Sequence, residues 1–301
     1  MEITLSHRGV CVSDIARSAI FYEGALDFAP AADAATPAGT LFDPGAGHPG
    51  SASQARLLRN PQRVALELLR FQRPAASGPR VRRPNNQFGL THLAFYVESI
   101  SAVAERVRRC GGQVFEHTRA RYPEGGAEMM YCTDPDGTRI ELMQMAGAIP
   151  RFSHSGVCVR EVARAQRFYD ALGFAEAENY DLQHHSAWLD VINELDHVKL
   201  RAQMVRAAAG DTLELLHFTS PAAFGPTTVQ PFNRYGLTHL AFLTDDLEAA
   251  ASRVVANGGT ILHTDPVCRN DARRLFCSDP DGVRLVLLRR AAPAHFERQQ
   301  S

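Results

Sequence analysis

The sequence predicts an α+β protein built from four βαβββ modules, two in each of two tandem domains. Two observations support this prediction. Segments of the first half recur in the second half at a nearly constant spacing, and each half contains two units of strand, helix and further strands. At 301 residues, the chain is long enough for two domains of about 150 residues that each bury a core.

The internal repeat defines the domains. Three of the matching pairs are offset by 147 residues and the fourth by 145: Ser6–Val12 with Ser153–Val159, Leu66–Leu69 with Leu213–Leu216, Gly89–Phe95 with Gly236–Phe242, and Asp134–Gly137 with Asp279–Gly282. The third pair is identical over seven residues, which chance does not produce. We therefore expect domains over residues 1–148 and 151–290, separated by a stretch of small residues and proline and followed by a polar tail over 291–301.

Each half divides again into two similar units. The first unit begins with a strand over Leu5–Val12, followed by a helix with an apolar face for which Asp14 is a suitable N-cap. The second unit begins with a strand over Leu90–Val97. A helix follows, with Ser99 as its expected N-cap and Gly111–Gly112 at its end.

Further short strands follow each predicted helix. Arg63–Phe71 is rich in Val and Leu, and the strands Glu128–Cys132 and Thr138–Met145 are joined by the turn Asp134–Gly137. Because side chains alternate along a strand, Glu67 must point to a face that is otherwise apolar. An unpaired carboxylate is costly to bury there, and a bound cation would remove that cost.

Charge and hydropathy exclude several classes of partner. Lys and Arg together number 32 against 33 for Asp and Glu, so there is no basic field to attract nucleic acid. No segment approaches the 18 to 20 apolar residues that cross a bilayer, and the first residues do not form a secretion signal. The six cysteines are scattered without a C-x-x-C pair. These features predict a cytoplasmic protein that acts on a small molecule, as a monomer or a homodimer.

Several motifs together resemble the vicinal oxygen chelate superfamily. They are the paired βαβββ modules, a histidine on the first strand, Phe-Tyr in the first helix of each half, G-L-T-H-L-A-F, and D-P-D-G-x-R-I-E-L. That superfamily includes glyoxalase I, extradiol ring-cleaving dioxygenases and bleomycin-resistance proteins. The resemblance covers nearly the whole chain. It implies two half-open, eight-stranded barrels whose inner strands supply metal ligands.

The family's ligand pattern falls on four residues of the first half: His7, Glu67, His92 and Glu141. Two neutral imidazoles and two carboxylates balance a divalent ion and leave positions open for substrate if coordination is octahedral. We expect one ion of Fe, Mn, Ni, Zn or Co in this half.

The second half retains only part of the pattern. It offers His154, Glu214 and His239, but Val286 stands where Glu141 would recur. Phe276 likewise replaces Tyr131 and loses a hydroxyl. Two histidines and one carboxylate can still hold a metal, yet we expect this copy not to catalyse.

The resemblance implies an enzyme of glyoxalase type, an isomerase or lyase. The metal would act as a Lewis acid on adjacent oxygens of a small substrate, and Glu67 or Glu141 would move a proton. One alternative is an extradiol dioxygenase that uses Fe(II) on His7, His92 and Glu141 with Tyr131 nearby. The loop 73–87 lacks the acid–base histidine usual in such enzymes, and Tyr122 occupies the place of another. A second alternative is a resistance protein that sequesters a ligand without turnover.

Overall fold

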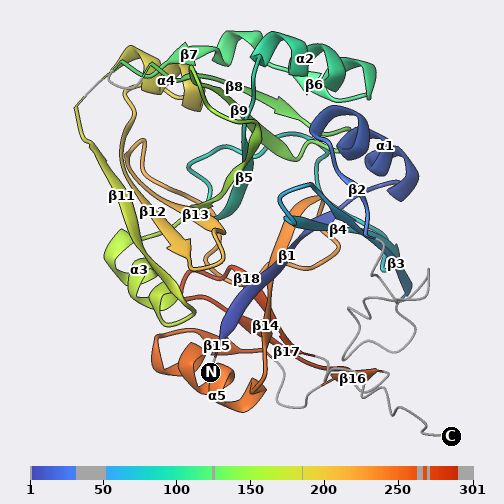
Figure 1. Cartoon of the computed structure of the whole chain (residues 1–301). Coiled ribbons are helices and arrows are strands. Elements are labelled where there is room, and N and C mark those ends of the chain that lie inside the picture. Colours follow the sequence, from blue (N-terminus) through green and yellow to red (C-terminus); the bar gives the residue numbers. More distant parts are fainter. Residues whose placement is uncertain are drawn as a thin grey trace, which may run out of the picture.

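The computed structural model describes residues 2–31, 52–123, 126–184, 186–262, 267–269 and 272–290, so the predicted tail over 291–301 lies outside it. The described chain forms two curled mixed sheets of nine strands each, with helices on their outer faces (Figure 1). The predicted fold class is confirmed, although the sheets are curled and do not close into barrels. No helix in the described ranges is long and apolar enough to span a membrane.

The four predicted modules follow one another along the chain. Module 1 contains β1 (Ile3–Cys11), α1 (Ile15–Leu26), β2 (Ala29–Pro30), β3 (Ala52–Arg59) and β4 (Ala65–Arg73). Module 2 contains β5 (Gly89–Tyr96), α2 (Ile100–Arg109), β6 (Gln113–Val114), β7 (Ala120–Arg121), β8 (Glu128–Thr133) and β9 (Arg139–Gln144). A single 3₁₀ turn over Glu116–Thr118 precedes β7.

Modules 3 and 4 repeat this order in the second half. Module 3 contains β10 (Arg151–Cys158), α3 (Val162–Asp170), β11 (Phe174–Leu182), α4 (Ala187–Asn193), β12 (Lys199–Ala207) and β13 (Thr212–Ser220). Module 4 contains β14 (Gly236–Thr244), α5 (Leu247–Ala256), β15 (Thr260–Ile261), β16 (Val267–Arg269), β17 (Ala272–Ser278) and β18 (Arg284–Arg289). The short helix α4 connects two strands that would otherwise form a hairpin.

The helices begin where the sequence predicts. The Asp14 carboxylate accepts the backbone N–H of Arg17 at 2.9 Å, and the Ser99 hydroxyl accepts that of Ala102 at 3.2 Å. Such side chains replace the hydrogen-bond partners that the first turn of a helix lacks. Both helices therefore start at a fixed point directly after the first strand of their module.

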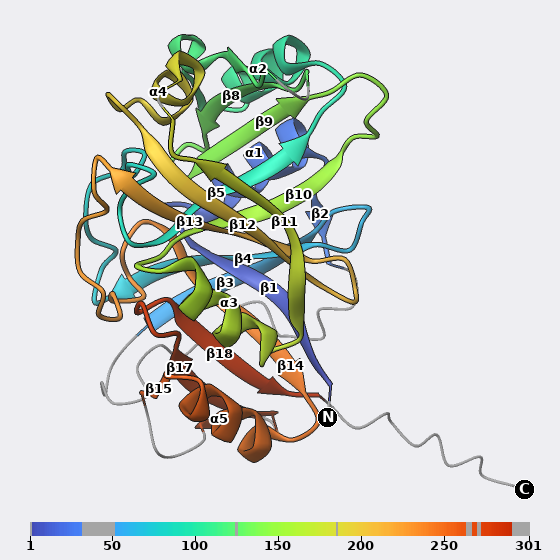
Figure 2. The same ribbon diagram turned by 90° about the vertical axis from the view of Figure 1, so that its left-hand side faces the viewer.

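The sheets combine modules from different halves of the chain. One sheet, here called the 1–4 sheet, joins modules 1 and 4, because β1 pairs antiparallel with β14. The other, the 2–3 sheet, joins modules 2 and 3 through the antiparallel pair β5 and β10 (Figure 2). We expected the modules within one half to pair. Local sequence could not distinguish the two arrangements, because β5 and β14 contain the same seven residues.

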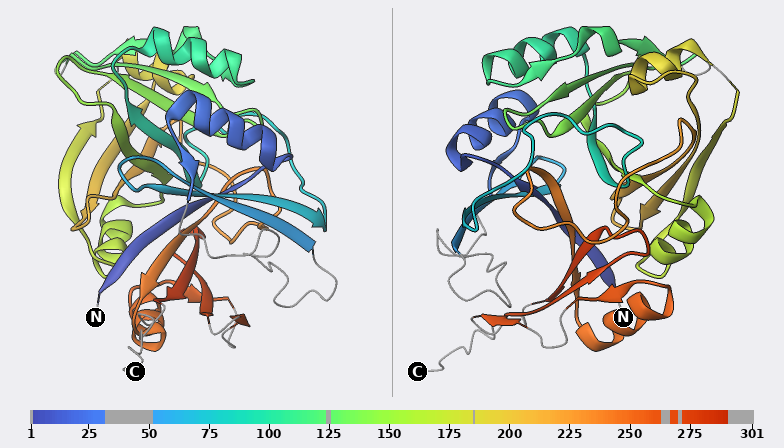
Figure 3. Two further views of the ribbon diagram at one scale, coloured as in Figure 1. Left: turned by 45° about the vertical axis from the view of Figure 1, so that its right-hand side comes forward. Right: turned by 180° about the vertical axis from the view of Figure 1, so that it is seen from behind.

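The helix-side cores, by contrast, form mainly within each half. One core joins α1 and α2 with β1, β4, β5, β8 and β9, and the other joins α3 and α5 with strands of modules 3 and 4. Figure 3 shows these two helix pairs at opposite ends of the molecule. The hydroxyl of Tyr22 donates to Asp134 at 3.0 Å, and Tyr169 donates to Asp279 at the same distance. The repeated Phe-Tyr and D-P-D-G motifs thus fasten two modules of the same half together.

Candidate metal centre

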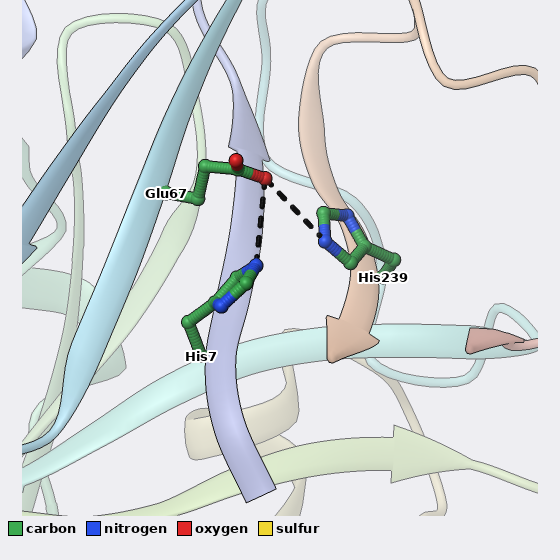
Figure 4. A group of neighbouring side chains, drawn as sticks. All are labelled: His7, Glu67 and His239. Atoms are coloured by element: carbon green, nitrogen blue, oxygen red, sulfur yellow. Dashed lines mark ion pairs between the residues drawn. The ribbon is translucent and has the colours of Figure 1, made fainter. Parts of the chain in front are cut away.

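Two clusters of histidine and glutamate lie on the inner faces of the sheets, one on each. The four-ligand site, on the 2–3 sheet, contains His92, Glu141, His154 and Glu214. The three-ligand site, on the 1–4 sheet, contains His7, Glu67 and His239 (Figure 4). Both clusters lie where the first strands of two modules pair, so each site takes residues from both halves of the sequence.

The four-ligand site has the spacing of a metal centre. The Nε2 atoms of His92 and His154 lie 3.1 Å apart. Each of these atoms lies 3.4–3.6 Å from an Oε2 atom of Glu141 and of Glu214. Two atoms that bind one ion at about 2.1 Å lie about 3.0–3.4 Å apart at angles of 90–109°. His92, His154 and Glu214 bring one ligand atom each within 4.8 Å of the others, and Glu141 extends this cluster through its 3.6 Å contacts with the two histidines.

The three-ligand site has similar spacing but one ligand fewer. The Oε2 atom of Glu67 lies 3.5 Å from Nε2 of His7 and 3.6 Å from Nε2 of His239. This carboxylate is 3% exposed, and its Oε2 has no hydrogen-bond partner among the described residues. Such an orphaned oxygen also fits a cation. Val286, which pairs with Ala241 as Glu141 pairs with Ala94, occupies the fourth position.

The structure divides the ligand set that the sequence suggested. His7 and Glu67 lie in the three-ligand site, whereas His92 and Glu141 lie in the four-ligand site. The first half therefore does not assemble one complete set by itself. His154 and Glu214, which we assigned to a degenerate copy, complete the set around His92 and Glu141. The predicted ligand set is divided because module 1 pairs with module 4, and module 2 with module 3.

Each histidine of the two sites is oriented by the hydroxyl residue that precedes it. The Oγ atoms of Ser6 and Ser153 and the Oγ1 atoms of Thr91 and Thr238 lie 3.0–3.1 Å from Nδ1 of the next residue. A proton on Nδ1 that is donated to this oxygen leaves the Nε2 lone pair free for a metal. These four residues were missed, although a Ser-His or Thr-His pair in every module was visible in the sequence.

Two glycines make room for the histidine rings. A Cβ atom on Gly156 would lie 2.3 Å from Cε1 of His92, and a Cβ on Gly9 would lie 2.1 Å from Cε1 of His239. Any larger residue would push these rings out of place. The motif Ser-His-x-Gly of modules 1 and 3 therefore supplies a ligand, its hydrogen-bond partner and space for the opposing ligand.

Burial separates the pKa values in the four-ligand site. Burial lowers the pKa of His92 to about 3. It raises the pKa of Glu141 to about 7, with the nearby Glu214 adding to the effect and His154 opposing it. Burial also acts to raise the pKa of Glu214, but the charge and hydrogen bond of His154 outweigh it and hold that pKa below its usual value. Two carboxyl groups in one site thus differ in proton affinity.

A polar cluster borders the four-ligand site and was largely missed by the sequence analysis. Tyr131, opposite Glu141 in the β8–β9 pair, lies with its ring 5.8 Å from that of His92. The side-chain amide of Asn85 donates to the Tyr131 hydroxyl at 3.0 Å and to Asn193 at 3.1 Å. Asn85 is 1% exposed, and its Oδ1 has no partner in the described chain.

A second polar layer lies behind Tyr131. The Arg139 guanidinium carbon lies 4.5 Å from the centre of the Tyr131 ring, and its Nη1 is a buried donor with no partner in the described chain. The carboxylate of Glu194, directly after α4, accepts hydrogen bonds from Arg82, His117 and Arg139. These contacts fix α4 of module 3 against module 2, beside the site.

Comparisons with known proteins identify the family and the fold. The chain matches the Glyoxalase/Bleomycin resistance protein/Dioxygenase superfamily over residues 4–142 and 151–287. Its structure is similar to glyoxalase I from Zea mays, with a TM-score of 0.68 and 19% identity over 96% of this chain and 92% of that chain. It is also similar to a protein from Bacillus subtilis that is provisionally named a dioxygenase, with a TM-score of 0.51 and 12% identity over 95% and 84% of the two chains.

No curated protein sequence matches the chain significantly. The two structures are below 25% identity and establish only the fold. The superfamily match covers almost all of both halves, and the inner faces of the sheets carry histidine and glutamate clusters with metal-like spacing. The chain therefore belongs to the Glyoxalase/Bleomycin resistance protein/Dioxygenase superfamily.

Proposed function

We propose that this protein is a divalent-metal-dependent enzyme of glyoxalase type whose catalytic centre is the four-ligand site. The main support is that two carboxylates, two histidines and a buried tyrosine meet at this site. The three-ligand site lacks the second carboxylate and the tyrosine. In this proposal Glu67 has no catalytic part, and the roles expected for the first half belong to residues of modules 2 and 3.

His92, Glu141, His154 and Glu214 would hold the metal. When bound, the ion would supply Lewis-acid polarisation of adjacent oxygens on a small substrate. The imidazoles are suited to this role because Thr91 and Ser153 fix their ring orientation. Burial of both histidines disfavours their protonated forms, although the two carboxylates oppose this at His154, whose pKa is raised.

The two carboxyl groups are suited to moving a proton. In the metal-free protein the pKa of Glu214 is lowered and that of Glu141 is about 7, so Glu141 is the stronger base of the two and the one suited to take a proton from carbon and return it. Carboxyl groups with separated proton affinities are a recurring arrangement for acid–base catalysis. Together the two carboxyl groups would allow a proton to be removed from a carbon of the substrate and a proton to be returned to the substrate.

Tyr131 is suited to stabilise a developing negative charge. Burial, reinforced by the Glu141 carboxylate, raises the pKa of its hydroxyl well above the usual value, so the group remains protonated. Its oxygen already accepts a hydrogen bond from Asn85, which leaves the hydroxyl proton available for a substrate oxygen. A fixed donor of this kind favours an oxyanion in the transition state.

The proposal is tested by proton exchange in D₂O without oxygen. Metal-loaded protein is mixed with small 2-oxoaldehydes and a thiol, and NMR follows loss of the proton on the carbon next to the carbonyl. Exchange or isomerisation that needs no O₂ and persists with Zn²⁺, Ni²⁺ or Co²⁺ would support the proposal. Binding of these compounds without exchange or turnover would support the ligand-sequestering alternative.

A ring-cleaving dioxygenase is the second candidate. The observation in its favour is that His92, His154 and one glutamate form a two-histidine, one-carboxylate set beside the Tyr131 hydroxyl. Such an enzyme would consume O₂ with catechols and would need Fe(II) or Mn(II). Oxygen-electrode measurements with a catechol panel separate the two candidates directly.

A further inference from the structure

A cavity of about 800 Å³ lies at the seam between the two sheets. Its walls include β1 and the β3–β4 turn from module 1 together with β10, β11 and the β12–β13 turn from module 3. This volume is within the range of sites that hold small molecules. None of the metal-ligand side chains lines it, so the cavity is distinct from both metal sites.

The cavity carries more positive than negative charge. Four arginines line it, and two of them are paired with the lining carboxylates, Arg8 with Asp211 at 2.7 Å and Arg206 with Glu178 at 3.0 Å. Arg63 and Arg151 are exposed and have no ion pair within the described ranges of the chain. The Arg151 guanidinium lies 4.4 Å from the Tyr96 ring centre and donates to the Ile149 carbonyl at 3.4 Å, so neither its charge nor that of Arg63 is balanced by a carboxylate of the described chain.

Arg8 anchors the floor of the cavity. Its side chain is 1% exposed, and it also donates to the hydroxyl of Ser155 at 3.2 Å, across the seam. Ser155 is the residue equivalent to Arg8 in the repeat, offset by 147 residues. The guanidinium carbon lies 4.7 Å from the centre of the Phe152 ring. The duplication has thus diverged at this point to place one buried cation between the sheets.

Arg63 adopts a left-handed backbone conformation, and the equivalent residue in the repeat is a glycine. Arg63 has a φ of 67°, in the left-handed region, and the equivalent residue, Gly210, has a φ of 95°. The two turns have the same hydrogen bonds, Arg63 N–H to Asn60 and Gly210 N–H to Ala207. A glycine would adopt this turn without strain, whereas an arginine at this position lowers the stability of the fold. Strained residues of this kind concentrate at binding sites.

The cavity also contacts the groups that orient two metal ligands. Ser6 and Ser153 line it, and their hydroxyls are the partners of Nδ1 of His7 and His154. A ligand in the cavity would therefore lie next to the hydrogen-bond partner of one histidine in each metal site.

We propose that this seam cavity binds a small anionic molecule carrying a phosphate or carboxylate group, held by Arg63 and Arg151. The positive excess, the cavity of small-molecule size and the strained arginine are independent observations, and all three are explained by an anion at this position. The proposal does not depend on the reaction at the four-ligand site.

Calorimetric titration of the full chain with inorganic phosphate and with succinate, against NaCl of equal ionic strength, tests the proposal. We expect saturable binding of at least one of the two anions, with one site per chain. Binding of phosphate alone would identify a phosphorylated ligand, and binding of succinate alone a carboxylate. Heats equal to those with NaCl would overturn the proposal.

Two variants locate the site. Arg63→Gly and Arg151→Gln should each weaken binding at least about tenfold, the loss of one charge-assisted contact. Arg63→Gly should also keep or raise the melting temperature, because glycine suits this turn. Arg109→Gln, on the exposed end of α2 and outside the cavity, should bind as the natural protein does. Unchanged binding in both cavity variants would refute the site. The titration is repeated with His92→Ala, which disables the proposed catalytic site. Anion binding that persists in this variant belongs to the cavity and does not depend on the proposed catalysis.

Discussion

The four-ligand and three-ligand sites occupy equivalent positions on two equivalent sheets, yet only the four-ligand site has a second carboxylate, a tyrosine and an asparagine beside its candidate ligands. Three positions differ together: Glu141 corresponds to Val286, Tyr131 to Phe276, and Asn85 to Phe232. In the three-ligand site, the two phenylalanine rings lie 5.7 Å apart and belong to one apolar cluster with Val286. The scaffold has retained the ligand positions and replaced the groups that would act on a substrate.

This comparison shows what duplication in one chain permits. Each site combines a histidine and a glutamate position from one module with the same two positions from another. The three-ligand site uses modules 1 and 4, and the four-ligand site uses modules 2 and 3. A change at residue 286 therefore alters the three-ligand site and leaves Glu141 in place. In a symmetric dimer of half-length chains, the same change would remove a ligand from both sites. The tandem chain can lose one site without losing the other.

The largest expected difference between the sites concerns a metal ligand. His92→Ala should abolish turnover and stoichiometric metal binding, because it removes a ligand of the proposed catalytic centre. His239→Ala, at the equivalent position of the other site, should leave most of the activity. Activity assays and metal analysis of the two purified variants provide the measurement. Equal loss of turnover in both would show that the sites are not functionally different.

The hydroxyl partners offer a finer test of the same comparison. Thr91→Val removes the hydrogen bond to Nδ1 of His92 and should weaken metal affinity by about 10–100-fold, as is usual for such partners. Thr238→Val is the matched variant of the three-ligand site and should leave the tightly bound ion unaffected. Competition with a fluorescent chelator measures both affinities. A larger effect from Thr238→Val would contradict the assignment of the main metal site.

Val286→Glu restores the missing carboxylate. In the metal-free protein we expect a loss of about 1–3 kcal/mol in unfolding free energy, because a carboxyl group is buried against Phe276. Added divalent metal should recover this stability and raise the stoichiometry to two ions per chain. Val286→Gln introduces a side chain of nearly the same shape as glutamate but without its charge, so added metal should not restore the stability of this variant. Urea unfolding with and without metal tests both variants.

Tyr131→Phe makes the four-ligand site resemble its counterpart at one position. Because Tyr131 donates to the developing oxyanion and a carboxylate moves the proton, turnover should fall by about 10²–10³-fold and stay independent of O₂. Phe276→Tyr, the reverse change on the other sheet, should have no effect on turnover. A collapse of activity in Tyr131→Phe together with a strict need for O₂ and Fe(II) would favour the dioxygenase candidate.

The smallest expected effect concerns the attachment of α4, beside the four-ligand site. Burial acts to raise the pKa of Glu194, but hydrogen bonds from Arg82 and His117 outweigh it and lower that pKa to about 2. A carboxylate with a depressed pKa stabilises the fold above its unfolded pKa of about 4.3, and this contribution disappears as pH falls toward 2. Glu194 is partly exposed, so we expect Glu194→Gln to cost no more than about 1 kcal/mol at pH 7.

Urea unfolding at several pH values checks this last expectation. The stability difference between the natural protein and Glu194→Gln should be constant from pH 7 to pH 5 and should shrink below about pH 4. Glu105→Gln, which breaks an exposed pair with Arg108 on α2, is the control and should have a smaller effect. A difference that grows in acid would contradict the depressed pKa of Glu194.

The sequence predicted the modules better than their pairing. The helix caps at Asp14 and Ser99 and the D-P-D-G turns were predicted correctly because local chemistry determines them, and the histidines and glutamates were recognisable only as candidate ligands. The strand that pairs with β1 could not be predicted, because Gly89–Phe95 and Gly236–Phe242 have the same sequence and either could pair with β1. The ligand set was therefore assembled from residues that the fold keeps on separate sheets.

The residues around the ligands were harder to predict for a different reason. Asn85 lies in a loop, and Asn193 ends a helix that interrupts a hairpin of module 3, so neither follows a strand or helix pattern. Their contact depends on the 2–3 sheet bringing distant segments together. The preceding Ser or Thr of each histidine was a visible signal whose meaning became clear only from the distances to Nδ1.

Pairing across the halves also sets an order in which the protein can fold during synthesis. The 2–3 sheet is built from residues 89–220, a continuous stretch in the middle of the chain. The 1–4 sheet must join strand β1, made first, to β14, which pairs in turn with the later strand β18. Contacts between the ends of a chain form late, because a long loop must close and synthesis must finish. The four-ligand site can therefore assemble while β14, the antiparallel partner of β1, is still being made.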